Sequence, residues 1–169
     1  LDCGPNTILD ITSNSTLAVN GPVYFRGELG NEIEVISSDS SGSFLVYQSK
    51  QVSKVVHTIF SGLNEQHQSY WHVTGAVNFY EADVYFSKCI FQNNHSEDGL
   101  NIFRSTFMID SCTFVNTYSD AFDGDFCIGV VKNSEFSNIG NDALDFSGSS
   151  INLRNLSIEY VEDKAISAG

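Results

Sequence analysis

Positive charge is the scarcest feature of this sequence. Eight Lys and Arg residues stand against 21 Asp and Glu residues, and the formal net charge is −13. A surface of this sign repels phosphate backbones, and the few cations form no basic patch. The composition therefore argues against nucleic acid as a partner. It also argues against polyanionic sugars, unless a cation mediates the contact.

Long apolar runs and the common motifs of metal, nucleotide and redox sites are also missing. No stretch of about 18 apolar residues occurs, so the sequence predicts no membrane-spanning segment. The cysteines, which are Cys3, Cys89, Cys112 and Cys127, have no C-x2-C spacing, which argues against zinc and thioredoxin-like redox sites. A phosphate loop and a Ser-His-Asp signature are absent, so NTPase and esterase roles have no support.

What the sequence has in abundance is typical of β-structure. Thirteen Phe and seven Tyr residues accompany many Ser, Asn, Ile and Val residues, and this mixture suits strands and tight turns. Hydrophobic residues make up 41% of the chain and charged residues 17%, which argues against disorder. The 169 residues are enough for one domain with a sizeable core.

The second half of the chain repeats itself every 22 or 23 residues. One stripe holds a polar residue followed by a small and an apolar residue, and its copies begin at Asp98, Asp120, Asp142 and Lys164. A second stripe has the copies Cys89-x-Phe91-x-Asn93, Cys112-x-Phe114-x-Asn116, Ser134-x-Phe136-x-Asn138 and Leu156-x-Ile158-x-Tyr160. Two independent stripes with one period indicate a solenoid of stacked repeats.

Within each repeat, apolar residues occupy every second position of short runs, which are separated by Ser, Asn, Gly and Asp. Such alternation is typical of strands with one buried face. The leucine-rich pattern L-x-x-L-x-L-x-x-N is absent. The sequence therefore predicts an all-β fold, a parallel β-helix or β-solenoid of about 22 residues per rung and roughly seven rungs.

Equivalent residues of neighbouring rungs are expected to lie about 4.8 Å apart, one above the other. One inward apolar stack is predicted, with the members Phe91, Phe114, Phe136 and Ile158. A second is predicted, with the members Leu100, Phe122, Leu144 and Ile166. An amide ladder at a turn is predicted for Asn93, Asn116 and Asn138. Cys89 and Cys112 share the parity of the first stack, and either buried thiols or a rung-to-rung disulfide fits them.

The expected domain organisation follows from where the repeat is regular. We expect one β-helix domain over 1–169, with irregular rungs over 1–61, a polar surface loop over 62–70 and regular rungs over 71–169. Solenoids need caps on their open ends, and this chain ends part-way through a rung with no capping helix. We therefore expect a fragment of a longer protein, incomplete at its C-terminal end. Its uncapped last rung would be an exposed sheet edge that favours self-association.

The rungs resemble those of pectate-lyase-like right-handed β-helix proteins. The resemblance is carried by Asp98-Gly99-Leu100-Asn101, Ser119-Asp120-Ala121-Phe122-Asp123, Asn141-Asp142-Ala143-Leu144-Asp145 and Asp163-Lys164-Ala165-Ile166-Ser167. They look most like the β-helix modules of large bacterial surface proteins, some of which carry spore-coat-H-like kinase domains. The resemblance implies a right-handed coil and an extracellular or cell-surface location. It implies no single activity, because the superfamily includes lyases, hydrolases, epimerases and phage spikes.

Aspartates recur at two positions of the repeat and form a predicted acidic stripe. Its members are Asp98, Asp120 and Asp142 and, three residues further along the rungs, Asp123 and Asp145. Stacked carboxylates repel one another, so either a bound cation or exposure to screening solvent must offset the repulsion. Because Ca2+ binds carboxylate oxygens, these five residues are the candidate metal ligands. The alternative is a set of solvated turns, in which Asp bonds its own backbone.

Two catalytic alternatives use the same stripe. Its carboxylates resemble the acid and base of polygalacturonase-type inverting glycoside hydrolases, but the Gly-His-Gly and Arg-x-Lys motifs of that family are absent. A Ca2+-dependent polysaccharide lyase needs a basic residue beside the cation, and the candidates are Lys132, Arg154 and Lys164. Separately, an aromatic platform for a sugar ring is one hypothesis for Tyr70, Trp71 and Tyr80, which also fit core or turn positions.

The sequence thus indicates an extracellular or cell-surface β-helix module with a structural or carbohydrate-interacting role. A polysaccharide is the expected partner, Ca2+ is the candidate cofactor, and no residue is assigned to catalysis. The alternative is a fragment of a polysaccharide-active enzyme, a lyase or a glycoside hydrolase, that uses the acidic stripe.

Overall fold

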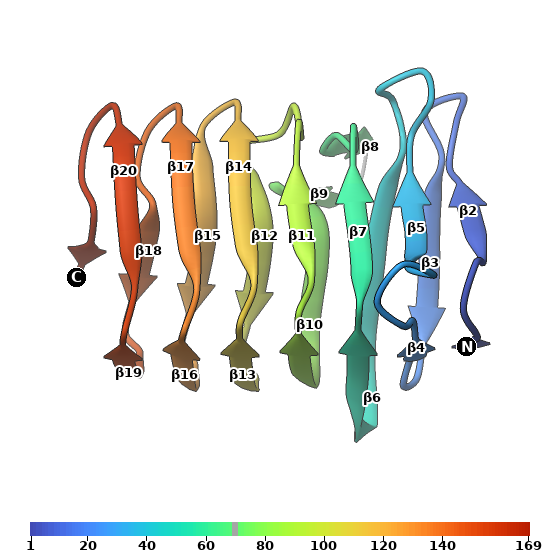
Figure 1. The fold of residues 1–169 in the computed structure, drawn as a ribbon, viewed down its shortest axis with the longest axis horizontal. Coiled ribbons are helices and arrows are strands. Elements are labelled where there is room, and N and C mark those ends of the chain that lie inside the picture. Colours follow the sequence, from blue (N-terminus) through green and yellow to red (C-terminus); the bar gives the residue numbers. More distant parts are fainter. Residues whose placement is uncertain (69–70) are drawn as a thin grey trace.

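The computed structural model describes residues 1–68 and 71–169, with side chains for 1–66 and 73–169. These residues form 21 β-strands, which coil into a parallel β-solenoid of about seven turns, roughly 23 residues apart. In Figure 1 the coil advances from the N-terminus on the right to the C-terminus on the left. Front strands run upward and rear strands run downward, which makes the coil right-handed. The predicted all-β parallel β-helix is therefore confirmed.

The described strands line three faces of the coil, which we number one to three. Face one contains β3 (Thr16–Asn20), the first halves of β6 (Ser43–Val56) and β10 (Gly75–Ser87), β12 (Asp98–Phe103), β15 (Asp120–Asp125), β18 (Leu144–Ser147) and β21 (Ser167–Ala168). Face two contains β1 (Asp2–Cys3), β4 (Tyr24–Arg26), the second halves of β6 and β10, β13 (Thr106–Asp110), β16 (Ile128–Lys132) and β19 (Ser150–Arg154). Face three contains β2 (Ile8–Asp10), β5 (Ile33–Ile36), β7 (Thr58–Ser61), β11 (Ile90–Gln92), β14 (Thr113–Thr117), β17 (Glu135–Ile139) and β20 (Ser157–Val161).

Two further features stand apart from these faces. A short antiparallel hairpin joins β8 (Gln66–Gln68) to β9 (Trp71–Val73), so the segment 62–70 holds one strand of this hairpin. The described residues contain no helix, and therefore no helix that is long and apolar enough to cross a membrane.

The core is built from stacked side chains of one kind. Aromatic rings stack along face three with centroid distances of 5.0, 4.6 and 4.7 Å and interplanar angles of 10°, 5° and 4°, in the order Phe60, Phe91, Phe114, Phe136. The first predicted stack is confirmed, because β11, β14, β17 and β20 pair in that register. The second is confirmed for three members, Leu100, Phe122 and Leu144. The fourth member, Ile166, is 49% exposed, and the adjacent pair Asp145 and Ser167 keeps the register of the stack.

The Asn ladder closes the corner after face three. Asn116 Nδ2 donates to Asn93 Oδ1 at 3.2 Å, and Asn138 Nδ2 donates to Asn116 Oδ1 at 3.2 Å. The three residues have φ angles of 53°, 54° and 56°, in the left-handed region that Asn tolerates better than most residues. The predicted ladder is thus confirmed, and its backbone conformation explains why Asn recurs there.

The cysteines are free thiols in the interior. Cys89 and Cys112 are each 1% exposed, and neither forms a disulfide. Burial raises the pKa of the Cys89 thiol well above its ordinary value. Of the two interpretations that fit the sequence, the structure therefore has the buried thiols.

Candidate functional site

The candidate site lies on the outer surface of face one. Its strands align in register, so residues at one position form a row along the coil axis: Ala18, Leu45, Asn78, Asn101, Asp123 and Asp145. A second row lies two residues further along each strand and points to the same side: Asn20, Tyr47, Tyr80, Phe103, Asp125 and Ser147. Toward the C-terminal end, leucine and aromatic residues give way to aspartates.

The N-terminal part of these rows forms an aromatic groove. It has a volume of about 580 Å³ and is lined by Ala18, Leu45, Tyr47, Gln48, Val73, Tyr80, Glu81 and Phe103. The rings of Tyr80 and Phe103 are stacked, with centroids 5.3 Å apart and planes 28° apart. Because Val73 ends β9, the hairpin borders this groove.

The C-terminal part of the rows forms an acidic pocket beside the groove. It has a volume of about 270 Å³ and is lined by Thr74, Tyr80, Glu97, Asp98, Asn101, Phe103, Asp120, Asp123, Asp125 and Asp145. Tyr80 and Phe103 line both cavities. The apolar surface of the groove and the carboxyls of the pocket thus adjoin at the rings of Tyr80 and Phe103.

Asn101 connects the carboxyls of two rungs. Its Nδ2 donates to Asp98 Oδ2 at 3.0 Å and to Asp123 Oδ2, on the next rung, at 2.9 Å. Thr74 Oγ1 lies 3.3 Å from the same nitrogen. Asn101 is 4% exposed, and its Oδ1 is buried without a hydrogen-bond partner. Such an unpaired acceptor costs about 1–3 kcal/mol.

Burial controls the ionisation of the pocket. It raises the pKa of Asp98 to about 7, against hydrogen bonds from Thr74 and Asn101 that favour the charged form. It raises the pKa of Asp123 to about 8, and the carboxyl of Asp98 adds to that effect. Burial also raises the pKa of Asp120 and Asp125. The free pocket therefore holds protons at neutral pH.

The structure brings four of the five predicted metal ligands together. Asp98, Asp120, Asp123 and Asp145 line the acidic pocket. Asp142 lies outside it, where Oδ1 accepts from the Lys164 backbone N–H at 2.8 Å and Oδ2 lies 3.5 Å from Lys164 Nζ. In the described part of the chain, no three His, Cys, Asp or Glu side chains form a group that could hold a metal ion. The Ca2+ site therefore stays a prediction.

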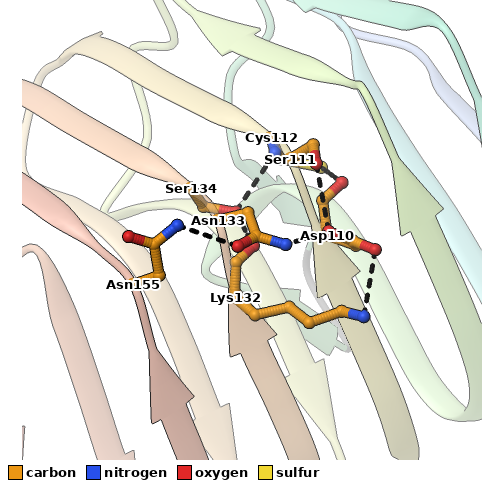
Figure 2. Close-up of polar contacts among 7 residues, drawn as sticks. All are labelled: Asp110, Ser111, Cys112, Lys132, Asn133, Ser134 and Asn155. Atoms are coloured by element: carbon orange, nitrogen blue, oxygen red, sulfur yellow. Dashed lines mark hydrogen bonds and ion pairs between the residues drawn. The ribbon is translucent and has the colours of Figure 1, made fainter.

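The candidate bases of the lyase hypothesis lie elsewhere. Figure 2 shows Lys132 on β16 beside Asp110 on β13, with Lys132 Nζ 3.1 Å from Asp110 Oδ2. Asn155 donates to Asn133, and Asn133 donates to Asp110, so this corner is a polar ladder of its own. Arg154 belongs to face two, and Lys164 pairs with Asp142 and Asp163. None of the three candidate bases is among the described residues that line the acidic pocket.

Sequence reasoning missed several lining residues. Asp125 and Phe103 each lie two residues beyond a member of the first row, Asp123 and Asn101, so the alternation of a strand could have found them. Glu97 precedes Asp98 directly. No signal in the sequence pointed to Thr74, which precedes β10. Of the predicted aromatic platform, Tyr80 lines the site, whereas Tyr70 and the side chain of Trp71 lie outside the described residues.

A comparison with protein-family models finds no match for this chain, and a comparison with curated proteins finds none either.

Proposed function

We propose that this chain is a carbohydrate-binding module that holds an oligosaccharide along the outer surface of face one. The observation that carries the proposal is the junction of the aromatic groove and the acidic pocket at Tyr80 and Phe103. We further propose an origin in the pectate-lyase-like β-helix superfamily and a place outside the cell or at its surface. The repeated rungs, with their stacked phenylalanines and their Asn ladder, support that origin.

The chemistry of the two cavities supports a sugar as the ligand. A sugar ring has a flat apolar side, which packs on the face of an aromatic ring. Its hydroxyl groups donate hydrogen bonds, and carboxyl and amide oxygens accept them. A concave apolar surface with a few converging polar groups is typical of a ligand site. The groove supplies the apolar surface, and the pocket supplies the acceptors.

Calorimetric titration of the purified chain with oligosaccharides tests the proposal. Phe103→Ala should weaken binding by about 3- to 10-fold, because a stacked aromatic contact contributes about 0.5–1.5 kcal/mol. Tyr118→Ala is the matched control, since Tyr118 is 74% exposed and lies outside both cavities. Equal affinity of Phe103→Ala and the unchanged chain would contradict the proposal, as would the failure of every oligosaccharide tested to bind.

A second candidate function is glycoside hydrolysis, and the raised pKa of Asp98 favours it. A carboxyl with a pKa of about 7 can act as a general acid at neutral pH. Glycoside hydrolases pair such an acid with a second carboxylate, and the other carboxyl residues that line this pocket are Glu97, Asp120, Asp123, Asp125 and Asp145. A hydrolase should release new reducing ends and lose turnover in Asp98→Asn while it still binds. If oligosaccharides bind but no new reducing ends appear, the chain binds the sugar without hydrolysing it.

A further inference from the structure

The corner between face one and face two holds large side chains on a backbone that disfavours them. Its residues align in register from rung to rung: Gln48, Glu81, Arg104, Phe126 and Gly148. Their φ angles lie between 49° and 61°, in the left-handed region. Glycine and asparagine enter this region readily, whereas larger residues do so at a cost. Strain of this kind is concentrated at functional sites, so the corner is a place to look for function.

The other two corners use their left-handed residues differently. After face three, Asn93, Asn116 and Asn138 form the Asn ladder. Figure 2 shows the corner after face two, where Asn155 donates to Asn133 in a second ladder. In both ladders the residue type suits the backbone, and the side chain bonds to a neighbouring rung. The corner after face one contains no asparagine in this conformation.

Gln48 and Glu81 border the aromatic groove with unused polar groups. Both residues are exposed, and both line the groove. Among the described residues, no hydrogen bond or ion pair engages either side chain. They are neighbours in register, about 4.8 Å apart along the coil axis. Arg104, on the next rung, lies 4.8 Å from the centre of the Phe103 ring and does not line the groove.

We propose that Gln48 and Glu81 determine which sugar the groove binds, through hydrogen bonds to the hydroxyl groups of the sugar. This inference rests on the proposed function and names the residues that set its specificity. The amide of Gln48 donates and accepts, whereas the carboxylate of Glu81 only accepts. A sugar whose hydroxyls match this pair is bound, and one that leaves the polar atoms unpaired is disfavoured.

Replacement by asparagine should change binding and stability in opposite directions. Asparagine adopts the left-handed conformation more readily than Gln or Glu, so Gln48→Asn and Glu81→Asn should each raise the urea concentration at the midpoint of unfolding. Its side chain is shorter, and the lost hydrogen bonds should weaken binding by about 3- to 10-fold. A purely structural role would not give this opposition.

Lys88→Asn is the matched control for relief of strain. Lys88 has a φ of 54° at the corner after face two, and it lies outside the groove and the pocket. The variant should raise the midpoint of unfolding in the same way and leave the affinity for the sugar unchanged.

Glu81→Gln is the control for charge and length. It removes the negative charge but keeps the length of the side chain and the strain of the backbone. The midpoint of unfolding should therefore stay near that of the unchanged chain. The binding loss should be smaller than in Glu81→Asn, because the longer amide still reaches the sugar and its oxygen still accepts a hydrogen bond.

The probes are β-1,4-linked hexamers of glucose, mannose and xylose, which differ in the orientation or the presence of hydroxyl groups. Calorimetric titration of the full chain measures each affinity. The unchanged chain should favour one hexamer by about 10-fold or more, as a difference of one or two hydrogen bonds would give. Gln48→Asn and Glu81→Asn should each reduce that ratio, and Lys88→Asn should preserve it.

Four results would overturn the inference. Unaltered affinities in both groove variants would refute it, while the proposed function survives. Failure of all three hexamers to bind the unchanged chain would refute both. A loss of stability together with affinity would make the two residues structural. Weaker binding with an unaltered ratio between the hexamers would show that they contact the sugar without selecting it.

Discussion

Faces one and three of this coil share one backbone but use their side chains in opposite ways. Face three repeats the same residues from rung to rung, with four stacked phenylalanines inside and three asparagines at its corner. The outer rows of face one change character, from Leu45 and Tyr47 to Asp123 and Asp125. Repetition lets each side chain pack against a copy of itself, which stabilises the coil. Variation places unlike groups side by side, which creates the groove and the pocket.

The comparison predicts that stability depends on face three and binding on face one. Phe114→Ala should lower the free energy of unfolding by about 3–5 kcal/mol, because it leaves a cavity between two stacked rings. Phe114 lies 4.6 Å from Phe91 and 4.7 Å from Phe136, centroid to centroid. Urea unfolding measures the change. Binding of oligosaccharides by the folded fraction should be unaltered.

Phe103→Ala on face one gives the reciprocal experiment. Its ring is only partly buried, so its removal should cost clearly less stability than Phe114→Ala and should weaken binding. Equal losses of stability in the two variants would break the proposed division between the faces. Tyr118→Ala should change stability by less than about 0.5 kcal/mol, as is usual for exposed positions.

The acidic pocket should make the protein less stable as the pH rises. The pKa of Asp98 is about 7 when folded, against 3.8 for the free side chain, so the folded state binds the extra proton between those values. Its contribution is fully present below about pH 4 and is lost as the pH passes through 7. Since each unit of pKa corresponds to about 1.4 kcal/mol, the loss should be on the order of 2–4 kcal/mol. Urea unfolding at a series of pH values measures it.

Asp98→Asn isolates this effect from other titrations. The variant cannot ionise there, so it should exceed the unchanged chain in stability at pH 9 by about the same amount. Asp110→Asn is the control, because hydrogen bonding from Asn133 lowers the pKa of Asp110, and its titration is complete at lower pH. If the free energy of unfolding depended on pH in the same way for Asp98→Asn and the unchanged chain, ionisation of the buried Asp98 carboxyl would make no contribution to that dependence.

The fold was predictable because regular repetition is visible in one sequence. Phe91, Phe114 and Phe136 recur at steps of 23 and 22 residues, and these steps set which residues stack. The site was predictable only in part. Asp123 and Asp145 belong to the repeat and were found, whereas Phe103 and Thr74 matter because they depart from it. Asp142 shares the position of Asp120 in the repeat, but a different neighbour, Lys164, engages its carboxylate.

The smallest expected effect concerns the Asn ladder beside face three. Asn116→Ala should lower the free energy of unfolding by about 1–2 kcal/mol, because alanine is strained at the φ of 54° that this residue adopts. Asn116→Gly should cost less, since glycine adopts that conformation without strain. Urea unfolding of both variants at one pH gives the comparison.

The pair of variants separates two reasons for which Asn recurs. The difference between Ala and Gly reports backbone strain, and the difference between Gly and Asn reports the amide bonds to Asn93 and Asn138 together with the greater chain entropy of glycine. If strain dominates, Gly should recover most of the loss. If the amide bonds dominate, Ala and Gly should be equally destabilised. Because these amides are exposed, water replaces their bonds at little cost, and we therefore expect strain to be the larger contribution.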